Sequence, residues 1–407
     1  MKLLKAEAGV NDGKAGLLST AGLFAKGGIF DKKSESFNIQ ELDPYLLFDA
    51  RSSMLGTLEN PTLDLDPATP STLDVITATR SGTATYTDAD GLIATAPANT
   101  VRVDYVDSVP MILVEPSATN LFPYSEDFGV GGWAITSGTL TKNYTISPDG
   151  LQNGSKINFS TGGELVRTTN FTAGQIYTLS FYAKVESGSF DFTYGNIDYT
   201  LVAGTATTEW QRFEVTQTAP VATRYPKIDA TDTGDLLIWG AQLEAGSVAT
   251  SYIPTSGGDA AARTRAADDL AITGSAFTNF FNSGGDGTFY AEFVPEEIET
   301  VNNIITGHGG GGGGLYLYSN VPTYANVRSY DGTLATSYGD ATNNEINRAS
   351  VSYNSSTFKG SLNGSSEDST SHNGTFSAQT SLQLGYNVAS PISFKRVIYW
   401  PTHSSRL

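Results

Sequence analysis

The chain has 407 residues, enough for two or three domains with cores of their own. It carries 24 basic and 42 acidic residues, a net charge of −18, which disfavours nucleic acid and anionic membrane surfaces as partners. It has no cysteine, so a disulfide framework and a thiolate metal site are excluded. No apolar run approaches the about 20 residues that span a bilayer, and we expect no membrane insertion.

Residues 1–60 are predicted to form an extended arm that anchors the chain to a partner. Glycines at positions 9, 13, 16, 22, 27 and 28 interrupt every apolar stretch, so the arm cannot bury a core by itself. Its apolar clusters would be unfavourable in solvent and suit a groove on another protein. The predicted anchoring residues are Leu3, Leu4, Leu17, Leu18, Leu23 and Phe24. The start of this arm also lacks the continuous apolar segment of a secretory signal peptide.

Residues 61–115 are predicted to be a short β connector region. Five prolines interrupt it, and only short strand-like segments such as "VRVDY" (101–105) and "MILVE" (111–115) remain. Residues 257–285, which are rich in small and charged residues, are predicted to be a linker.

Strict alternation of apolar and polar residues predicts two separate antiparallel β-sandwiches, over residues 116–256 and 286–407. Short strands divided by Gly, Asn, Ser, Thr and Asp favour an all-β fold of the sandwich or jelly-roll type. The inward positions of the predicted strands include Leu179, Phe181, Phe289, Phe293 and Val351. We therefore expect these five side chains to be buried.

Six consecutive glycines, Gly309 to Gly314, lie between the strand-like segments 302–306 and 315–319. A phosphate-binding loop needs a following Lys-Ser/Thr and a helix, and neither is present here. The run is therefore interpreted as a flexible hairpin connection.

Known catalytic and metal-binding patterns are missing from the sequence. It contains no His-Glu-x-x-His, no Gly-x-Ser-x-Gly and no Cys–His pair, and its three histidines are widely separated. The acidic segments "SPDG" (147–150) and "TDADG" (87–91) could supply calcium ligands but are better explained as turns. We expect no catalytic residues, no metal ligands and no cofactor.

Several motifs together resemble a module found across tailed-phage virion proteins. In that module the pattern runs roughly Arg-Ala-Ser-x-Ala-Thr-Tyr, Pro-Arg-Phe-Asp-Tyr, Leu-Ile-Glu, Thr-Asn-Leu and Tyr-Ser-Glu-x-Phe. The resemblance covers about residues 75–270 and departs from the module where Val101 replaces its proline. The matching segments, in order, are "RSGTATYTDADGLIATAPANTVRVDY" (80–105), "LVEPSATNLFPYSEDF" (113–128), "GW" (132–133), "YTLSFYAKV" (177–185), "TEWQRFEVT" (208–216), "LIWGAQLEAGSVATSYIPTSGG" (237–258) and "TRAAD" (264–268).

Residues 286–407 resemble the laminin-G or concanavalin A-like sandwiches that often follow this module. The two resemblances imply a carbohydrate-binding-module-like jelly roll followed by a concanavalin-like sandwich. They also imply a virion appendage, such as a tail or head fibre, that is commonly trimeric and contacts host glycans. Other virion proteins, held through residues 1–60, would then be partners, and the localisation would be the surface of the phage particle.

Sugars stack on exposed aromatic rings, so the loop tyrosines are the candidate glycan-binding residues. These are Tyr194, Tyr324, Tyr330 and Tyr338. The four tryptophans, Trp133, Trp210, Trp239 and Trp400, sit in or beside strand motifs and are expected in the core. Two alternatives remain open at this point: a secreted carbohydrate-binding lectin or adhesin, and a polysaccharide depolymerase.

Overall fold

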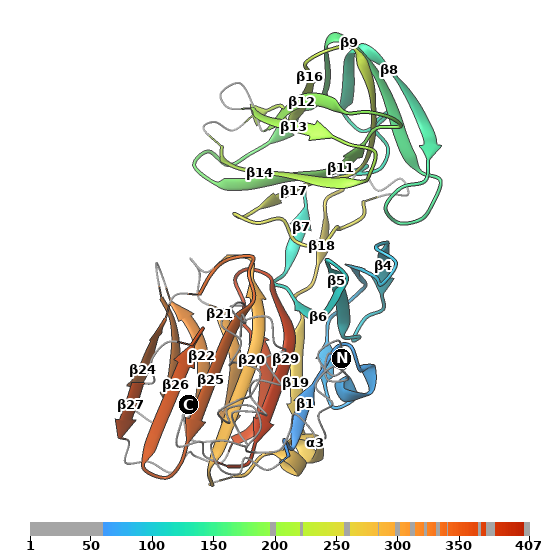
Figure 1. Cartoon of the computed structure of the whole chain (residues 1–407). Coiled ribbons are helices and arrows are strands. Elements are labelled where there is room, and N and C mark those ends of the chain that lie inside the picture. Colours follow the sequence, from blue (N-terminus) through green and yellow to red (C-terminus); the bar gives the residue numbers. More distant parts are fainter. Residues whose placement is uncertain are drawn as a thin grey trace, which may run out of the picture. The chain divides into compact units, whose positions relative to one another are not determined.

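The chain folds into antiparallel β-sheets with little helix in the computed structural model (Figure 1). The described part contains one α-helix, α3 (Gly274–Phe280), and one 3-10 helix, η4 (Pro70–Leu73). The structure describes residues 60–195, 201–219, 223–255, 261–283, 285–297, 302–309, 314–320, 324–330, 334–339, 341–364, 368–371 and 379–402. The expectation of an all-β sandwich protein is confirmed. The predicted arm, with its anchoring residues, lies outside the described residues.

One eight-stranded sheet forms the first sandwich, which we call the inserted sandwich (β8 to β17). Its long strand β9 pairs with β17 over residues 155–159 and with β16 over residues 164–166, so it takes part in both halves of the fold. The order of its strands is β13 (Val202–Ala206), β12 (Phe190–Gly195), β16 (Lys227–Ala230), β9 (Gly154–Arg167), β17 (Gly234–Ala245), β11 (Ile176–Lys184) and β14 (Gln211–Thr218), with β8 (Trp133–Thr145) paired to β9. A small pair, β10 (Thr169–Asn170) and β15 (Thr223–Arg224), accompanies it.

The core of the inserted sandwich is rich in aromatic residues. Leu179 and Phe181 of β11 are 3% and 1% exposed, as the alternation predicted. Phe181 stacks on Phe213 at 5.6 Å and meets Tyr194 edge-on at 5.3 Å between ring centroids. Such aromatic pairs add to the stabilisation that comes from area burial alone.

Two further sheets form the second sandwich, which we call the C-terminal sandwich. Its first sheet has the order β27 (Asp368–Ser371), β26 (Thr357–Leu362), β25 (Asn347–Tyr353), β20 (Gly287–Pro295), β29 (Ile392–Trp400), β6 (Val109–Val114) and β5 (Arg102–Val106), with β1 (Leu63–Leu65) also on β29. Its second sheet has the order β2 (Thr77–Thr79), β19 (Asp269–Thr273), β28 (Gln379–Tyr386), β21 (Asn302–Gly309), β22 (Gly314–Asn320), β23 (Tyr324–Tyr330) and β24 (Leu334–Gly339).

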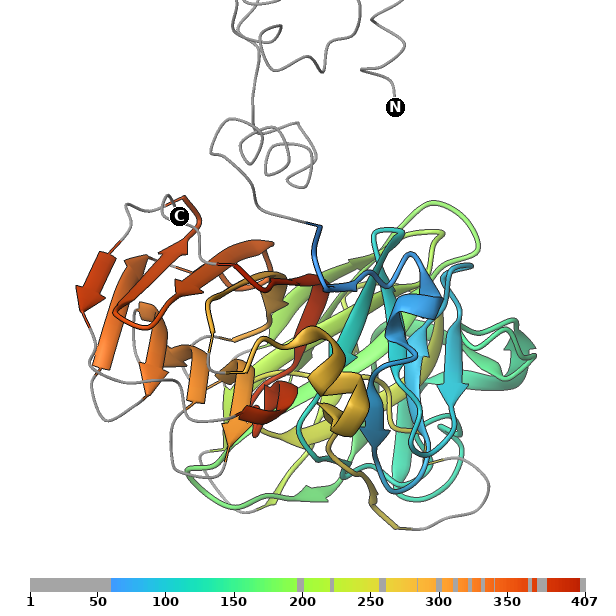
Figure 2. The same cartoon turned by 90° about the horizontal axis from the view of Figure 1, so that it is seen from below.

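The predicted connector and linker are not separate from this sandwich. Strands β1 and β6, from the predicted connector, pair with β29 near the end of the chain, so the blue β1 lies beside the red β29 (Figure 1, Figure 2). Strand β19, from the predicted linker, pairs with both β2 and β28. The boundaries 61–115 and 257–285 are therefore corrected, because pairing between segments so distant in sequence leaves no local pattern to detect.

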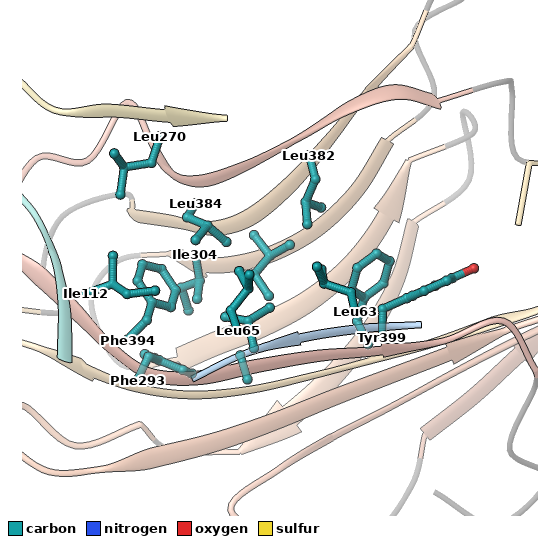
Figure 3. Packing of buried hydrophobic residues seen from close by; sticks show 14 of the residues in the cluster. Leu63, Leu65, Ile112, Leu270, Phe293, Ile304, Leu382, Leu384, Phe394 and Tyr399 are labelled. Carbon is teal, nitrogen blue, oxygen red and sulfur yellow. The ribbon is translucent and has the colours of Figure 1, made fainter. Parts of the chain in front are cut away.

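The core of the C-terminal sandwich shows the same merging of distant segments. Leu63 and Leu65 of β1 pack with Ile112 of β6, Leu270 of β19 and Phe394 of β29 (Figure 3). The expected burial of Phe289, Phe293 and Val351 is confirmed, at 3%, 1% and 4% exposure. The C-terminal sandwich is thus built from segments that precede and segments that follow the inserted sandwich in the sequence.

Two short pairs of strands complete the structure. Strand β7 (Ala118–Asn120) leads into the inserted sandwich, and β18 (Arg263–Arg265) follows it; the two pair with each other. Strands β3 (Ala84–Thr87) and β4 (Ile93–Ala96) form a hairpin. None of the helices in the described part is both long and apolar enough to cross a membrane.

The glycine run joins two neighbouring strands, as the sequence predicted. Strands β21 and β22, which flank it, pair antiparallel, with Thr306 opposite Tyr316. Residues 310–313 lie outside the described part of the chain.

Candidate functional site

The structure removes Tyr194 from the glycan candidates. It lies in β12, whose residues Phe192 and Tyr194 both face the core, and it is only 7% exposed. Its hydroxyl donates a hydrogen bond of 3.0 Å to the carbonyl of Glu214. A sugar needs an open ring face, so the prediction for Tyr194 is wrong; what was read as a loop is the inward face of a strand.

The other three candidate tyrosines lie on strands rather than in loops. Tyr324 and Tyr330 are the two ends of β23, and Tyr338 lies on β24, opposite Asn326 of β23. Their side chains lie outside the described residues, and their role stays a prediction.

The tryptophans divide into two groups. Trp239 and Trp400 are 1% and 3% exposed, as expected of core residues. Trp133, at the start of β8, and Trp210, just before β14, are half-buried at the surface of the inserted sandwich. Trp133 nevertheless packs against the core, edge-on to the buried Phe122 and Phe128, so the expectation that all four lie in the core is wrong for Trp210.

A buried group of charges joins the motifs that carry the virion-module resemblance. Asp268 of "TRAAD" accepts a hydrogen bond of 2.7 Å from Arg80 and is also bound by Arg102. Arg102 is 2.7 Å from Glu115, which Arg265 approaches at 3.4 Å. All five side chains are 2% exposed or less. We call them the buried ionic network.

The electrostatics of this network fit a structural role. Burial by itself would raise the pKa of Glu115, but Arg102, Arg265 and two hydrogen bonds from Ser251 lower it to about 2. The acid is therefore held ionised, and it has no open space for a substrate. Its partners come from β5, from β18 and from the segment after β17, so the network fastens the strands that enter and leave the inserted sandwich. This fastening gives a structural reason for the five charged residues of the motifs that take part in it.

An exposed aromatic surface lies at the far end of β8 from Trp133. The indole N–H of Trp210 donates a hydrogen bond of 3.0 Å to the carbonyl of Ile146, which fixes the orientation of the ring. The Lys184 ammonium lies 5.1 Å from the ring centroid. Tyr144, two residues before Ile146, is 38% exposed. We call this region the Tyr144–Trp210 surface.

Charged and amide groups surround Tyr144. Its hydroxyl donates a 3.0 Å hydrogen bond to Glu186, and the Lys156 ammonium lies 4.8 Å from its ring centroid. Lys156 also contacts Asp235 at 2.5 Å, and this hydrogen bond raises the pKa of the lysine above its usual value. Asn158 donates to the same carboxylate. The lysine thus stays cationic across the physiological range.

The Tyr144–Trp210 surface combines features by which proteins bind saccharides. Its rings have fixed orientations and give apolar contact area, while ammonium, carboxylate and amide groups can hydrogen-bond to sugar hydroxyls. Ile146 and Leu151, 50% and 61% exposed, extend the apolar area. Sequence reasoning missed this site, although Tyr144 follows Lys142 and Asn143 and so stands out as an aromatic residue in a polar stretch.

The acidic segment at 147–150 forms a turn, as the sequence favoured. The amide of Gly150 donates to the carbonyl of Ser147 at 3.0 Å, and the amide of Leu151 donates to the Asp149 carboxylate at 3.0 Å. Within the ranges that the structure describes, no group of three or more His, Cys, Asp or Glu side chains could hold a metal ion.

Neither a protein-family model nor a curated protein sequence matches the chain. Among solved structures, it is similar to the Clostridium thermocellum endo-1,4-β-D-xylanase 10B CBM22-1–GH10 modules in complex with xylohexaose, with 14% identity and a TM-score of 0.25 over 34% of this chain and 30% of that one. It is also similar to the CBM22-1–CBM22-2 tandem of Paenibacillus barcinonensis Xyn10C, with 11% identity and a TM-score of 0.27 over 71% of this chain and 99% of that one.

A third similar structure is the enzymatically active domain of the bacteriophage CBA120 tailspike protein 4. Its identity is 14% and its TM-score 0.24, over 30% of this chain and 21% of that one. All three TM-scores lie below 0.5.

Proposed function

We propose that the chain is a non-enzymatic structural protein of a phage particle, a tail or head appendage that binds glycan on the host surface. Residues 1–60 attach it to other virion proteins, and the β-sandwiches are presented outward. Glycan binding takes place at the Tyr144–Trp210 surface.

The observation that carries glycan binding is the pair of oriented, accessible aromatic residues among charged groups. Trp210 is held by Ile146, and Tyr144 by Glu186, so neither ring has to be ordered when a sugar arrives. Pre-organised groups lose less conformational entropy on binding, which favours affinity.

The virion role is supported by the position, within the structure, of the motifs that resemble the virion module. Their charged residues build the buried ionic network, so the resemblance covers the frame that holds the inserted sandwich and not only surface loops.

The test is a glycan array followed by calorimetry with the best-bound glycan. Trp210→Ala and Tyr144→Ala should each weaken binding by about tenfold or more, a loss of about 1.4 kcal/mol. Tyr386→Ala is the matched control, since Tyr386 is 43% exposed but lies on β28 of the C-terminal sandwich. Unchanged affinity in the first two variants would place the glycan elsewhere.

Catalysis needs its own measurement. Incubation with the bound polysaccharide should release no reducing ends. Release that disappears when one carboxylate is replaced would show a depolymerase instead. Binding of glycan by a chain that never associates with phage particles would favour a free lectin.

A further inference from the structure

Arg167, the last residue of β9, is buried without a carboxylate partner. Its side chain faces the end of the inserted sandwich core, and the residue is 6% exposed. Within the part of the chain that the structure describes, it forms no ion pair, and its Nη1 has no hydrogen-bond partner.

The other buried arginines have carboxylate partners, unlike Arg167. Arg80 and Arg102 both bind Asp268, and Arg265 lies 3.4 Å from Glu115. The chain has 42 acidic residues, so a shortage of carboxylates does not explain why Arg167 lacks one. A buried cation without a counter-ion is unfavourable unless something else compensates it.

Aromatic rings compensate Arg167 in part. Its guanidinium carbon lies 5.2 Å from the centroid of Trp133 and 5.5 Å from that of Phe122, within the range of cation–π attraction. Burial lowers the pKa of Arg167, and only the nearby Tyr124 phenol opposes this effect. The contacts hold the planar group in place but leave its hydrogen-bonding capacity unused.

The rim around Arg167 reaches the surface. Trp133 is half-buried, and its indole N–H donates a hydrogen bond of 3.2 Å to the carbonyl of Tyr124. Tyr124 has a positive φ of 59°, an uncommon backbone conformation for a tyrosine, which sets its ring against the exposed Gly131. Tyr225, next to the Pro226 whose carbonyl accepts from the Arg167 amide, is 46% exposed.

We propose that Arg167 is the anion-recognising group of a second saccharide site, which binds the carboxylate of a hexuronic acid residue. A guanidinium binds a carboxylate through two parallel hydrogen bonds, and the ligand supplies the missing counter-ion. The Trp133, Tyr124 and Tyr225 side chains give the sugar ring apolar contact. This site lies at the Trp133 end of β8, so it is independent of the Tyr144–Trp210 surface.

The experiment compares two ligands on the unaltered protein. Tri-galacturonate and its methyl ester have the same sugar rings, but only the free acid carries charge. Calorimetry should show that the free acid binds at least about tenfold more tightly than the ester. In NMR spectra, addition of the free acid should shift the indole N–H resonance of Trp133, which is assigned by its disappearance in Trp133→Phe. Equal binding of acid and ester, or no binding of the acid, would overturn the proposal.

Variants locate the site. Arg167→Gln should remove the preference for the acid, Arg167→Lys should keep part of it, and Arg263→Gln, which removes an exposed arginine of β18, should keep all of it. A preference that survives in a folded Arg167→Gln protein would contradict the assignment. Inorganic phosphate that binds as tightly as tri-galacturonate would also contradict it, because the site would then recognise a simple anion.

Discussion

Arg102 and Asp268 stand 166 positions apart in the sequence and form one buried ion pair. Arg102 begins β5, and Asp268 directly precedes β19, so the pair joins the two edges of the insertion point. Asp268 is also joined to Glu115 through the backbone, since the amide of Glu115 donates to the Asp268 carboxylate at 3.0 Å and the amide of Asp268 donates to the carbonyl of Glu115 at 3.0 Å. The insertion is thus fixed by charge as well as by strand pairing.

Replacing Asp268 should be severely destabilising. Asp268→Asn leaves Arg80 and Arg102 buried with too little negative charge, and loss of one partner of a buried pair reduces stability by about 3–5 kcal/mol. Urea unfolding measures this change. The neighbouring Asp269 is exposed, so Asp269→Asn should stay within about 0.5 kcal/mol of the parent chain. A loss for Asp268→Asn as small as that expected for Asp269→Asn would mean that the network contributes little to stability.

The stability of the protein should depend on the ionised form of Glu115 at acid pH. Its pKa falls from an ordinary 4.5 to about 2 in the fold, so its contribution is present above pH 4.5 and is lost as the pH falls through about 2. We expect the free energies of unfolding of the parent chain and of Glu115→Gln to differ most at pH 7 and to converge toward pH 2. A difference that does not change with pH would contradict this assignment.

Strand β1 should be essential to the C-terminal sandwich although it has three residues. Leu65 is fully buried, and Leu65→Ala should lower the free energy of unfolding by about 2–5 kcal/mol. Leu151→Ala, which alters a leucine that is 61% exposed, should be nearly neutral. Thermal or urea unfolding distinguishes the two. If Leu65→Ala leaves the free energy of unfolding unchanged, β1 does not stabilise the C-terminal sandwich, which would favour the predicted separate region 61–115.

Deletion of residues 1–58 should leave folding unchanged but prevent assembly into particles. The deletion stops before Leu63 and Leu65, so both sandwiches should unfold at the parent temperature. Incorporation into phage particles should be abolished, as particle purification and protein staining would show. Full occupancy of particles by the shortened chain would place the anchor elsewhere.

We also expect the full-length chain to form a trimer. Light scattering at micromolar concentration measures its mass directly, against 43.1 kDa for one chain. A monomeric mass would limit trimer formation to the assembled particle.

The strands themselves were predictable because the side chains of a strand point alternately to its two faces, so a half-buried strand alternates apolar and polar residues in the sequence. Alternation placed Leu179, Phe181 and Phe289 correctly in the core. It did not reveal that β1 and β29 are neighbours, since pairing over more than 300 residues leaves no periodic signal. The insertion was missed for this reason.

The candidate site was harder to predict than the fold. Residue type alone does not separate a tyrosine in a core from one on a surface, and Tyr194 was assigned wrongly on that basis. Trp210 was placed in the core, yet it lies half-buried at the end of a strand, where its ring is held by a carbonyl. Arg167 gave no signal, because a missing partner is visible only in three dimensions.

The pairing of β7 with β18 sets Ala118 opposite Arg265, so the chain leaves the C-terminal sandwich and returns to it at one place. Domain insertions are tolerated where the ends of the inserted domain lie close together. We therefore expect that the inserted sandwich can be replaced by another domain whose ends lie close together. Under the proposed function, exchange of this domain by recombination would change the glycan that is bound, while the C-terminal sandwich, built from segments on both sides of the insertion, would be retained.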